Sequence, residues 1–193
     1  MQQRSEETRT RLLEAALKRF ANHGYNAASV DDICADAGVS KGAFYHHFPS
    51  KQAVFLALLD GWLETIDLGL KAAHQETVPE TLLRMTAVLP AVLASADERL
   101  PMFLEFWLQA SRDEAIWQAT IAPYHRYQAY FAALIQAGIE EGSFAPVDPQ
   151  AAARTVLAMA VGFLLQGLLD PRGANWETIV REGMEIILKG LRA

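Results

Sequence analysis

The sequence has little of several features, and each scarcity excludes a class of protein. A single cysteine, Cys34, excludes an intramolecular disulfide framework and is typical of a reducing compartment. Twelve glycines and eight prolines in 193 residues are too few for a fibrous or low-complexity chain. The longest uninterrupted apolar run, residues 156–165, is short, whereas a membrane-spanning helix needs about 20 residues. Residues 2–7 are polar or charged, so we expect no signal peptide and a soluble, cytoplasmic protein.

Charge is distributed unevenly along the chain. The whole chain carries a net charge of −6, yet residues 1–55 hold seven Lys or Arg and six Asp or Glu, a net charge of +1. Residues 37–59 contain no acidic residue but hold two lysines and two histidines. Attraction to phosphate is local, because the Debye length at physiological salt is only about 8 Å. An acidic chain can therefore carry a segment suited to DNA.

No pattern in the sequence indicates an enzyme or a metal site. Residues 38–42 match the G-x-S-x-G pattern of hydrolase nucleophile elbows, but that motif follows a strand, and here a helical pattern precedes it. The five histidines show neither H-x-x-x-H nor H-E-x-x-H spacing, and no glycine-rich phosphate loop occurs. We therefore expect no enzymatic activity, no cofactor and no metal ion.

Apolar residues recur at helical spacing through the first sixty residues. The pattern predicts a first helix that ends at Gly24, two short helices over residues 30–37 and 41–48, and a fourth helix from residue 51. Ser29 and Ser40 stand where they can cap the two short helices. Two short helices joined by three residues have the geometry of a helix-turn-helix.

The second of these short helices has a face suited to the major groove of DNA. Its inward stripe consists of Val39, Phe44 and Phe48, and the outward residues are Lys41, Gly42, Ala43, Tyr45 and His46. Small residues near the start of a helix let it sit deep in a groove, and the dipole at that end favours phosphate. The buried face of the preceding helix includes Cys34, which we expect to be a small core residue rather than a reactive thiol.

The stretch from Thr8 to Trp62 resembles the DNA-binding domain of TetR-type transcriptional regulators, without an insertion. Its most specific pieces are GYNAASVDDI, AGVSKGAFYHHF and PSKQAV at their mutual spacing. The family usually has Ala at Cys34, Thr or Ser at Ala43, and Leu or Ile at Phe44. The changes at Cys34 and Phe44 keep an apolar residue, whereas Ala43 lacks a hydroxyl that would meet phosphate or a base.

The resemblance implies a role for each matching residue. Base edges are expected to face Lys41, Gly42 and Ala43, and the DNA backbone is expected to be gripped by Ser40, Tyr45, His46 and Lys51. The chemistry agrees, since lysine can read guanine O6 and N7, glycine and alanine permit close approach, and a tyrosine hydroxyl suits phosphate. We add the hydroxyl of Ser29 as a phosphate contact, and Arg4 as part of a flexible arm.

The pattern stays helical beyond residue 62. We expect a helix from Pro79 to about residue 95, a nearly all-apolar helix over 100–109 that is buried on every side, and an amphipathic helix over 114–142. Asp148 and Pro149 begin another helix that reaches residue 169, and a last helix follows Asn175. The fold class is therefore all-α with about nine helices: a three-helix DNA-binding head over residues 1–50 and a helical dimerisation and ligand-binding body over 51–193.

Two helices of the body are candidates for a homodimer interface. The helix over residues 149–169 is rich in alanine and glycine, and the helix over about 123–142 has a second apolar edge at Tyr130, Ala133 and Ala137. Paired about a two-fold axis, they would form a four-helix bundle. In TetR-type proteins the corresponding helices do form the dimer interface. The alternative is that both helices belong only to the core of one chain.

Methionine and aromatic residues of the body are candidates for an apolar effector site. They are Met85, Phe103, Phe106, Trp107, Trp117, Tyr124, Met159 and Phe163. Glu105 and Gln109 can supply a polar end that favours a cationic ligand. The alternative is that the apolar set is ordinary core and that the polar pair is the solvated face of its helix.

These patterns and the resemblance to TetR-type regulators together predict a ligand-responsive transcriptional repressor that binds a palindromic DNA operator as a homodimer and is released by a small molecule. An activator or architectural protein without an effector remains open, as does a helical enzyme or carrier with a vestigial helix-turn-helix. The effector, the operator and the regulated genes do not follow from the sequence.

Overall fold

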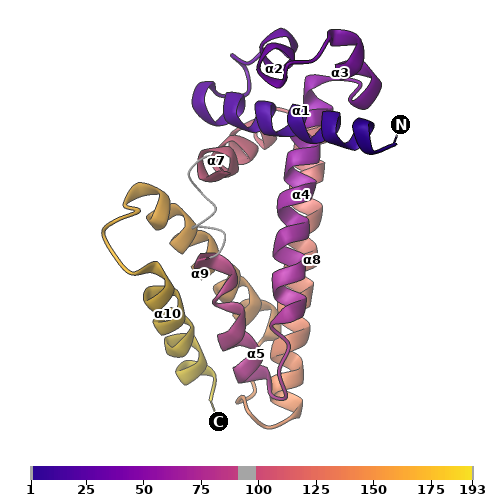
Figure 1. Cartoon of the computed structure of the whole chain (residues 1–193). Helices are drawn as coiled ribbons and strands as arrows, with labels where there is room; N and C mark the ends of the chain where they lie inside the picture. The colour runs from indigo at the N-terminus through magenta and orange to yellow at the C-terminus, as the bar shows by residue number, and fades with distance from the viewer. Residues whose placement is uncertain (1, 91–98, 193) are drawn as a thin grey trace. The chain divides into compact units, whose positions relative to one another are not determined.

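The computed structural model describes residues 2–90 and 99–192, which form nine bounded α-helices and no strand (Figure 1). Residues 88–90 are helical as well. The nine helices are α1 (Gln2–His23), α2 (Val30–Ala37), α3 (Lys41–His47), α4 (Lys51–Ala72), α5 (Val78–Met85), α7 (Arg99–Ala110), α8 (Glu114–Glu140), α9 (Pro149–Leu169) and α10 (Trp176–Leu191). The predicted all-α fold of about nine helices is confirmed for the described residues.

The chain divides into two compact units. Unit 1 comprises residues 1–64 and 97–120, and unit 2 comprises residues 65–96 and 121–193. Helices α4 and α8 contribute residues to both units. The predicted boundary at residue 50 separates a DNA-binding part from a dimerisation and ligand-binding part, whereas the two units are defined by packing. The functional boundary therefore stays a prediction.

Unit 1 packs α1, α2, α3, the first part of α4 and α7 around one apolar core. Helix α1 contacts α2, α3 and α7, and α2 contacts α3 beyond it (Figure 1). The side chains of Phe20, Phe44 and Phe55 are fully buried there. The predicted inward residues of the helix-turn-helix, Phe48 and Cys34 among them, belong to the same core, so that prediction is confirmed.

The ends of the short helices follow the predicted signals. Gly24 ends α1 with φ of 80° and Gly38 ends α2 with φ of 62°, a left-handed conformation that glycine adopts without steric cost. Ser29 and Ser40 are the N-caps of α2 and α3. Local sequence therefore determines where the helix-turn-helix begins and ends.

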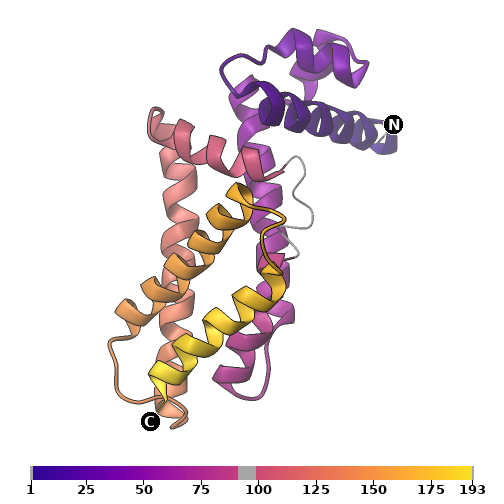
Figure 2. The same cartoon turned by 90° about the vertical axis from the view of Figure 1, so that its left-hand side faces the viewer.

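Unit 2 has a separate apolar core to which α5, α8, α9 and α10 contribute. Helix α10 packs against α5 and lies alongside α9 (Figure 2). The predicted caps hold, because Asp148 caps α9 with proline following it, and Asn175 caps α10. Unit 2 thus joins the buried faces of these four helices with the last part of α4, which adds Leu70 to the core.

Helix α5 is shorter than predicted. It begins at Val78 with Thr77 as N-cap, as expected, but it ends at Met85 and a turn follows at residues 86–87. The Thr86 hydroxyl donates a hydrogen bond to the Leu83 carbonyl at 2.6 Å, which competes with continuation of the helix. The predicted extension to residue 95 is therefore wrong at this turn, and residues 91–95 lie outside the described part of the chain.

Helix α7 forms where predicted, but the expectation that it is buried on every side is wrong. Met102 and Phe106 are buried, whereas Leu104, Trp107 and Leu108 are exposed. The helix packs one side against α1 and α4, and its composition gave no sign of that asymmetry. Gln109, a polar residue, is instead almost fully buried.

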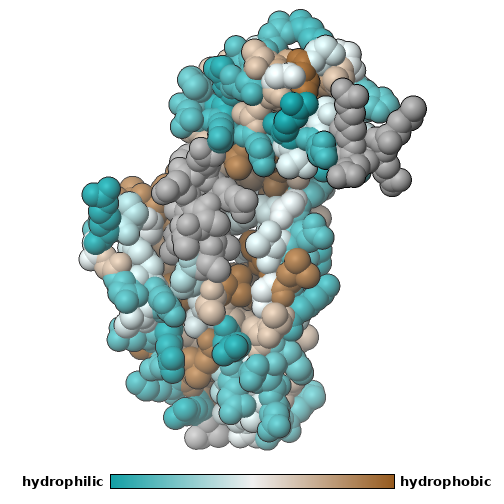
Figure 3. Space-filling model, in the orientation of Figure 1, coloured by the Kyte–Doolittle hydropathy of each residue, from teal (hydrophilic) through white to brown (hydrophobic). Residues whose placement is uncertain are grey.

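Helix α9 exposes much of its apolar surface in the single chain. Among the described residues it is the helix long and apolar enough to cross a membrane by length and composition, with a mean hydropathy of 1.7, and 22% of that stretch is buried. One such helix is weak support for a membrane span, because interior and interface helices pass the same test. In Figure 3, apolar side chains reach the visible surface of unit 2 in patches, while hydrophilic side chains cover most of the visible helix-turn-helix.

Candidate DNA-binding surface

The outward face of α3 is exposed as the helical pattern predicts. The side chains of Lys41, Tyr45 and His46 are exposed, Gly42 is exposed and Ala43 is half-buried. Tyr45 keeps 55% of its surface accessible and packs its ring edge against buried Phe44. The face thus combines a cation, a hydroxyl and two residues without bulky side chains, which suits close approach to a DNA groove.

Lys41 forms an ion pair that the sequence did not indicate. Its ammonium nitrogen lies 2.6 Å from a carboxylate oxygen of Asp31 on α2, and both side chains are exposed. The hydrogen bond with Asp31 raises the pKa of Lys41. A base contact by Lys41 would therefore compete with this pair, because one ammonium cannot serve both partners in full.

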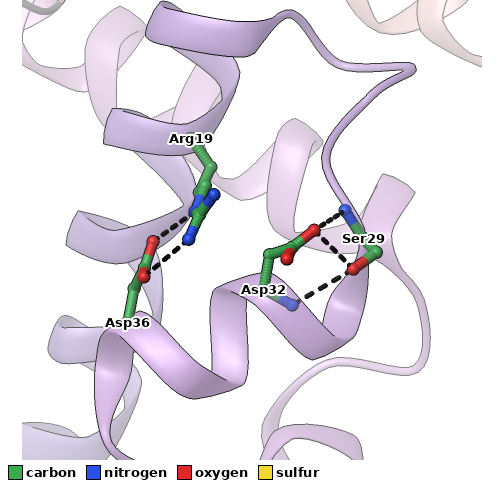
Figure 4. Close-up of polar contacts among 4 residues, drawn as sticks. All are labelled: Arg19, Ser29, Asp32 and Asp36. Atoms are coloured by element: carbon green, nitrogen blue, oxygen red, sulfur yellow. Dashed lines mark hydrogen bonds and ion pairs between the residues drawn. The ribbon is translucent and has the colours of Figure 1, made fainter.

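Ser29, the predicted N-cap of α2, forms a capping box with Asp32 (Figure 4). The Ser29 hydroxyl donates to the Asp32 carboxylate at 2.6 Å, and the Asp32 amide donates to the same hydroxyl oxygen at 3.1 Å. The hydrogen bonds from Ser29 lower the pKa of Asp32. A phosphate contact by Ser29 would require its hydroxyl to turn away from Asp32.

Arg19 of α1 and Asp36 of α2 form another polar contact within unit 1 (Figure 4). The guanidinium donates two hydrogen bonds to the carboxylate, one of them at 2.8 Å. These bonds from Arg19 lower the pKa of Asp36. The paired geometry fixes the orientation of α2 against α1 more narrowly than a single contact does.

Lys51, a predicted phosphate contact, is half-buried and bonded to the backbone. Its ammonium donates to the carbonyls of Tyr25 at 2.7 Å and Ala28 at 2.8 Å, and it lies 4.3 Å from the centroid of the Tyr25 ring. Burial lowers the pKa of Lys51. The side chain therefore anchors the turn between α1 and α2, with one of its three donors left over.

The other side of that turn is held by α7, which sequence patterns did not reveal. The Tyr25 amide donates to a carboxylate oxygen of Glu105 at 2.9 Å, and the Gln109 side chain donates to the same oxygen at 2.8 Å. Glu105 and Gln109 were expected to end a ligand pocket or to face solvent, and in the structure they bond to the turn and to each other. No local signal links residues 80 positions apart.

The predicted effector residues do not all lie in one unit. Phe106 is buried in the core of unit 1, and Met85 is buried in the core of unit 2. Trp107, Trp117 and Tyr124 are exposed. Unit 1 contains Phe103, Phe106, Trp107 and Trp117, and unit 2 contains Met85, Tyr124, Met159 and Phe163. The side chain of Phe103 lies outside the described part of the structure.

Two of these residues lie in a tight seam of unit 2. A Cβ atom added to Gly183 of α10 would lie 2.8 Å from the Phe163 ring and 3.2 Å from the Met159 sulfur. Both side chains thus pack against the glycine backbone. Their predicted part in an effector site stays a prediction.

The described residues show neither a metal-binding cluster nor a reactive thiol. Over residues 2–90 and 99–192, no group of three or more His, Cys, Asp or Glu side chains is placed to hold a metal ion. Cys34 is buried, as predicted, and burial raises the pKa of its thiol.

Comparisons with known proteins cover both parts of the chain. The family described as bacterial regulatory proteins, tetR family, matches residues 12–58, and the BetI-type transcriptional repressor C-terminal family matches residues 80–189. Helix-turn-helix regulator YfiR of Bacillus subtilis, itself uncharacterized, is 28% identical over 163 residues, covering 81% of this chain and 78% of that protein.

Two further relatives match nearly the whole chain. The A-factor receptor protein of Streptomyces griseus is 25% identical over 192 residues, covering 98% of this chain and 66% of the receptor. The crystal structure of a transcriptional regulator from Saccharomonospora viridis in complex with choline has a TM-score of 0.80 and 24% identity, covering 95% of this chain and 96% of that one. The helix-turn-helix, the helical body and both family matches place this chain in the TetR family of DNA-binding transcriptional regulators.

Proposed function

We propose that this protein is a ligand-responsive repressor that binds a palindromic operator as a homodimer and is released by a small molecule. The exposed face of α3 carries the proposal, since a capped short helix presents Lys41, Tyr45 and His46 to solvent beside residues of minimal bulk. The BetI-type repressor match over residues 80–189 supports the assignment as a repressor.

The proposed contacts follow the geometry of α2 and α3. Lys41, Gly42 and Ala43 at the start of α3 face base edges, and the remaining contacts are with the DNA backbone. Ala43 provides only apolar contact. The proposed backbone contacts are Ser29, Ser40, Tyr45, His46 and Lys51, the last through the one ammonium donor that the turn leaves over.

A second copy of the chain is the proposed cover for α8 and α9. On α8, the residues Tyr130, Ala133 and Ala137 are exposed along one face, while Phe131 and Ile135 point into the core of unit 2. On α9, a stripe of small residues at helical spacing stays at least partly exposed, namely Ala151, Thr155, Ala158 and Gly162. Two such faces, related by a two-fold axis, bring small side chains into close contact and bury the apolar surface of α9.

The proposed effector is an apolar or aromatic small molecule bound by the body. The BetI-type C-terminal match and two relatives, one named a receptor and one solved with the cation choline, support the binding of a small molecule but not its apolar character. A ligand releases DNA only if it prefers the conformation that does not bind DNA, and about 10³-fold release needs about 4 kcal/mol of differential affinity.

Alanine substitutions on α3 test the DNA-binding face. Lys41→Ala and Tyr45→Ala are each expected to weaken specific DNA binding by roughly 1–3 kcal/mol while leaving the helical fold intact. Lys189→Ala, which removes an exposed lysine of α10, is the control and should bind as the unchanged protein does. Equal binding by all three variants would contradict a role for α3.

Thermal shift and scattering test the effector and the dimer. Choline and short apolar or aromatic compounds are screened for a rise in melting temperature, and each hit is then titrated against the complex with DNA. A hit that raises the melting temperature and lowers DNA affinity supports ligand release. If hits bind without changing DNA affinity, the proposed coupling is wrong, and a monomer in light scattering would contradict the α8–α9 interface.

A further inference from the structure

The turn between α1 and α2 is held by two side chains of opposite charge from distant parts of unit 1. After Gly24, the backbone amide of Tyr25 donates a hydrogen bond to Glu105 of α7 at 2.9 Å. The carbonyl of the same residue accepts from Lys51 of α4 at 2.7 Å. Both backbone groups of one residue are therefore satisfied by side chains outside the helix-turn-helix.

The carboxylate of Glu105 is itself oriented by a buried neighbour. Gln109, one helical turn later and only 4% exposed, donates to the same oxygen of Glu105 at 2.8 Å. The other carboxylate oxygen lies 3.8 Å from the place of a Cβ on Gly24. A buried amide with a fixed partner restricts the carboxylate to one orientation, so the contact acts as a rigid clamp rather than a loose surface interaction.

Ring packing fixes α7 beside the turn. The ring of Tyr25 lies 4.6 Å from that of Phe55 between centroids, and Phe55 lies 4.6 Å from Phe106, the residue after Glu105. Phe55 and Phe106 are buried. Since the apolar and polar contacts act on the same residue, a shift of α7 would disturb the tilted ring contacts and the hydrogen bond of the Tyr25 amide together.

The clamped turn leads directly to the DNA-binding helices. It ends at Ser29, the N-cap of α2, and α2 leads through Gly38 to α3. Lys51 also binds the carbonyl of Ala28, the residue just before that cap. The position of the turn therefore contributes, together with the Arg19–Asp36 pair, to where α2 and α3 lie against α1.

We propose that Glu105 is a positioning residue for DNA binding, whose carboxylate, oriented by Gln109, fixes the turn and with it the placement of α2 and α3. The proposal rests on the proposed function as a DNA-binding regulator. It also makes α7 the element whose displacement would loosen the DNA-binding helices. Glu105 itself touches no DNA, so its effect is on the preorganisation of the surface rather than on the number of phosphate contacts.

The test compares substitutions that keep or remove the acceptor. Glu105→Ala removes it, Glu105→Gln keeps an oxygen at the same reach, and Glu114→Ala removes an exposed carboxylate of the same unit as the control. Each variant is measured by circular dichroism melting, by hydrogen exchange of residues 24–29 and by anisotropy with a selected duplex at two salt concentrations. The readouts separate folding, order of the turn and DNA affinity.

The proposal predicts a specific pattern across these readouts. Glu105→Ala should keep its helical content, exchange faster at residues 24–29 and bind the duplex about tenfold more weakly, with an unchanged dependence on salt. Glu105→Gln should bind the duplex within about twofold of the unchanged protein. The control Glu114→Ala should match the unchanged protein in all three readouts. Gln109→Met, which keeps an unbranched buried side chain but removes the donor, should lower affinity in the same direction even if Glu105→Ala fails to fold.

Three results would overturn the proposal. If Glu105→Ala exchanges faster but binds DNA with unchanged affinity, the contact stabilises the turn without affecting DNA binding. Equal losses in Glu105→Gln and Glu105→Ala would show that charge, not placement of the turn, is what matters. If the unchanged protein selects no duplex, the proposed function fails as well, and faster exchange in Glu105→Ala would still show separately that the clamp exists.

Discussion

Units 1 and 2 are both helical, yet different kinds of contact fix their geometry. In unit 1, charged side chains form directional hydrogen bonds. Arg19 binds the carboxylate of Asp36, and Lys51 and Glu105 bind the backbone of the turn between α1 and α2. In unit 2, aromatic rings lie directly on glycine backbones, as Phe144 does on Gly138. Directional polar bonds hold one arrangement, which a surface that must match DNA requires, whereas apolar packing depends on shape and volume.

A polar cluster in unit 2 qualifies this contrast without reversing it. Asp67 of α4 accepts from Arg126 at 2.8 Å and from the Tyr127 hydroxyl at 2.8 Å. Burial, followed by the hydrogen bond to Asp67, raises the pKa of Tyr127 to about 12. The cluster joins side chains of two helices, and in unit 1 the comparable bonds hold a turn that leads to the binding surface.

The largest expected effect comes from filling the space above a glycine in unit 2. In Gly138→Ala, the new methyl group would overlap the buried ring of Phe144, so we expect a loss of roughly 1–3 kcal/mol in the free energy of unfolding. Urea denaturation followed by circular dichroism measures it. Gly190→Ala on α10 is the control, because a methyl group added there meets no atom within 4 Å, and it should not lower the free energy of unfolding. Equal stability of the two variants would show that unit 2 does not depend on this fit.

Loss of the α2 cap should have a smaller effect. Ser29→Ala removes both hydrogen bonds between the hydroxyl and Asp32, with an expected cost of about 1 kcal/mol in the free energy of unfolding. Ser111→Ala, which removes an exposed hydroxyl that donates to the Leu108 carbonyl, is the matched control in the same unit. If the two variants have the same free energy of unfolding, the capping box contributes less to the stability of unit 1 than its geometry indicates.

Releasing Lys41 from its ion pair should strengthen DNA binding modestly. Asp31→Asn removes the negative charge 2.6 Å from the Lys41 ammonium, so affinity for the selected duplex should rise by about two- to tenfold, most at low salt. Asp60→Asn, an equal change of charge on α4, should have less effect. Weaker binding by Asp31→Asn would instead show that Asp31 orients Lys41 toward the DNA.

The smallest expected effect is a loss of stability as the pH falls. The pKa values of Asp32 and Asp36 are lowered in the folded state, so their contribution to stability is present above the unfolded value of about 4 and is lost as pH falls through the lower folded values. Asp36 is exposed and Asp32 is half-buried, so solvent screens both carboxylates and the change should be slight. Urea midpoints between pH 3 and 6 should fall less steeply in Asp36→Asn, and parallel curves would contradict this.

The sequence predicts what depends on neighbours along the chain. Helix ends at Gly24 and Gly38, caps at Ser29 and Ser40 and the exposed face of α3 all follow from local conformational rules, and the structure has each of them. The resemblance to TetR-type regulators over residues 8–62 agrees with the tetR family match over residues 12–58.

The sequence does not predict contacts made by the fold. The pair of Lys41 with Asp31 and the bond of Glu105 to Tyr25 join residues that only packing brings together, and composition misled for α7, where Trp107 is exposed and Gln109 is buried. The turn at Thr86 depends on one side-chain hydrogen bond that periodicity does not register.

The most direct test of the central claim is selection from a random duplex library, followed by titration of the enriched sequence at two salt concentrations. A palindromic site bound by two chains, with affinity that falls steeply as salt rises, is the predicted result. Absence of any enriched sequence, both for the protein alone and with each ligand found by thermal shift, would contradict it.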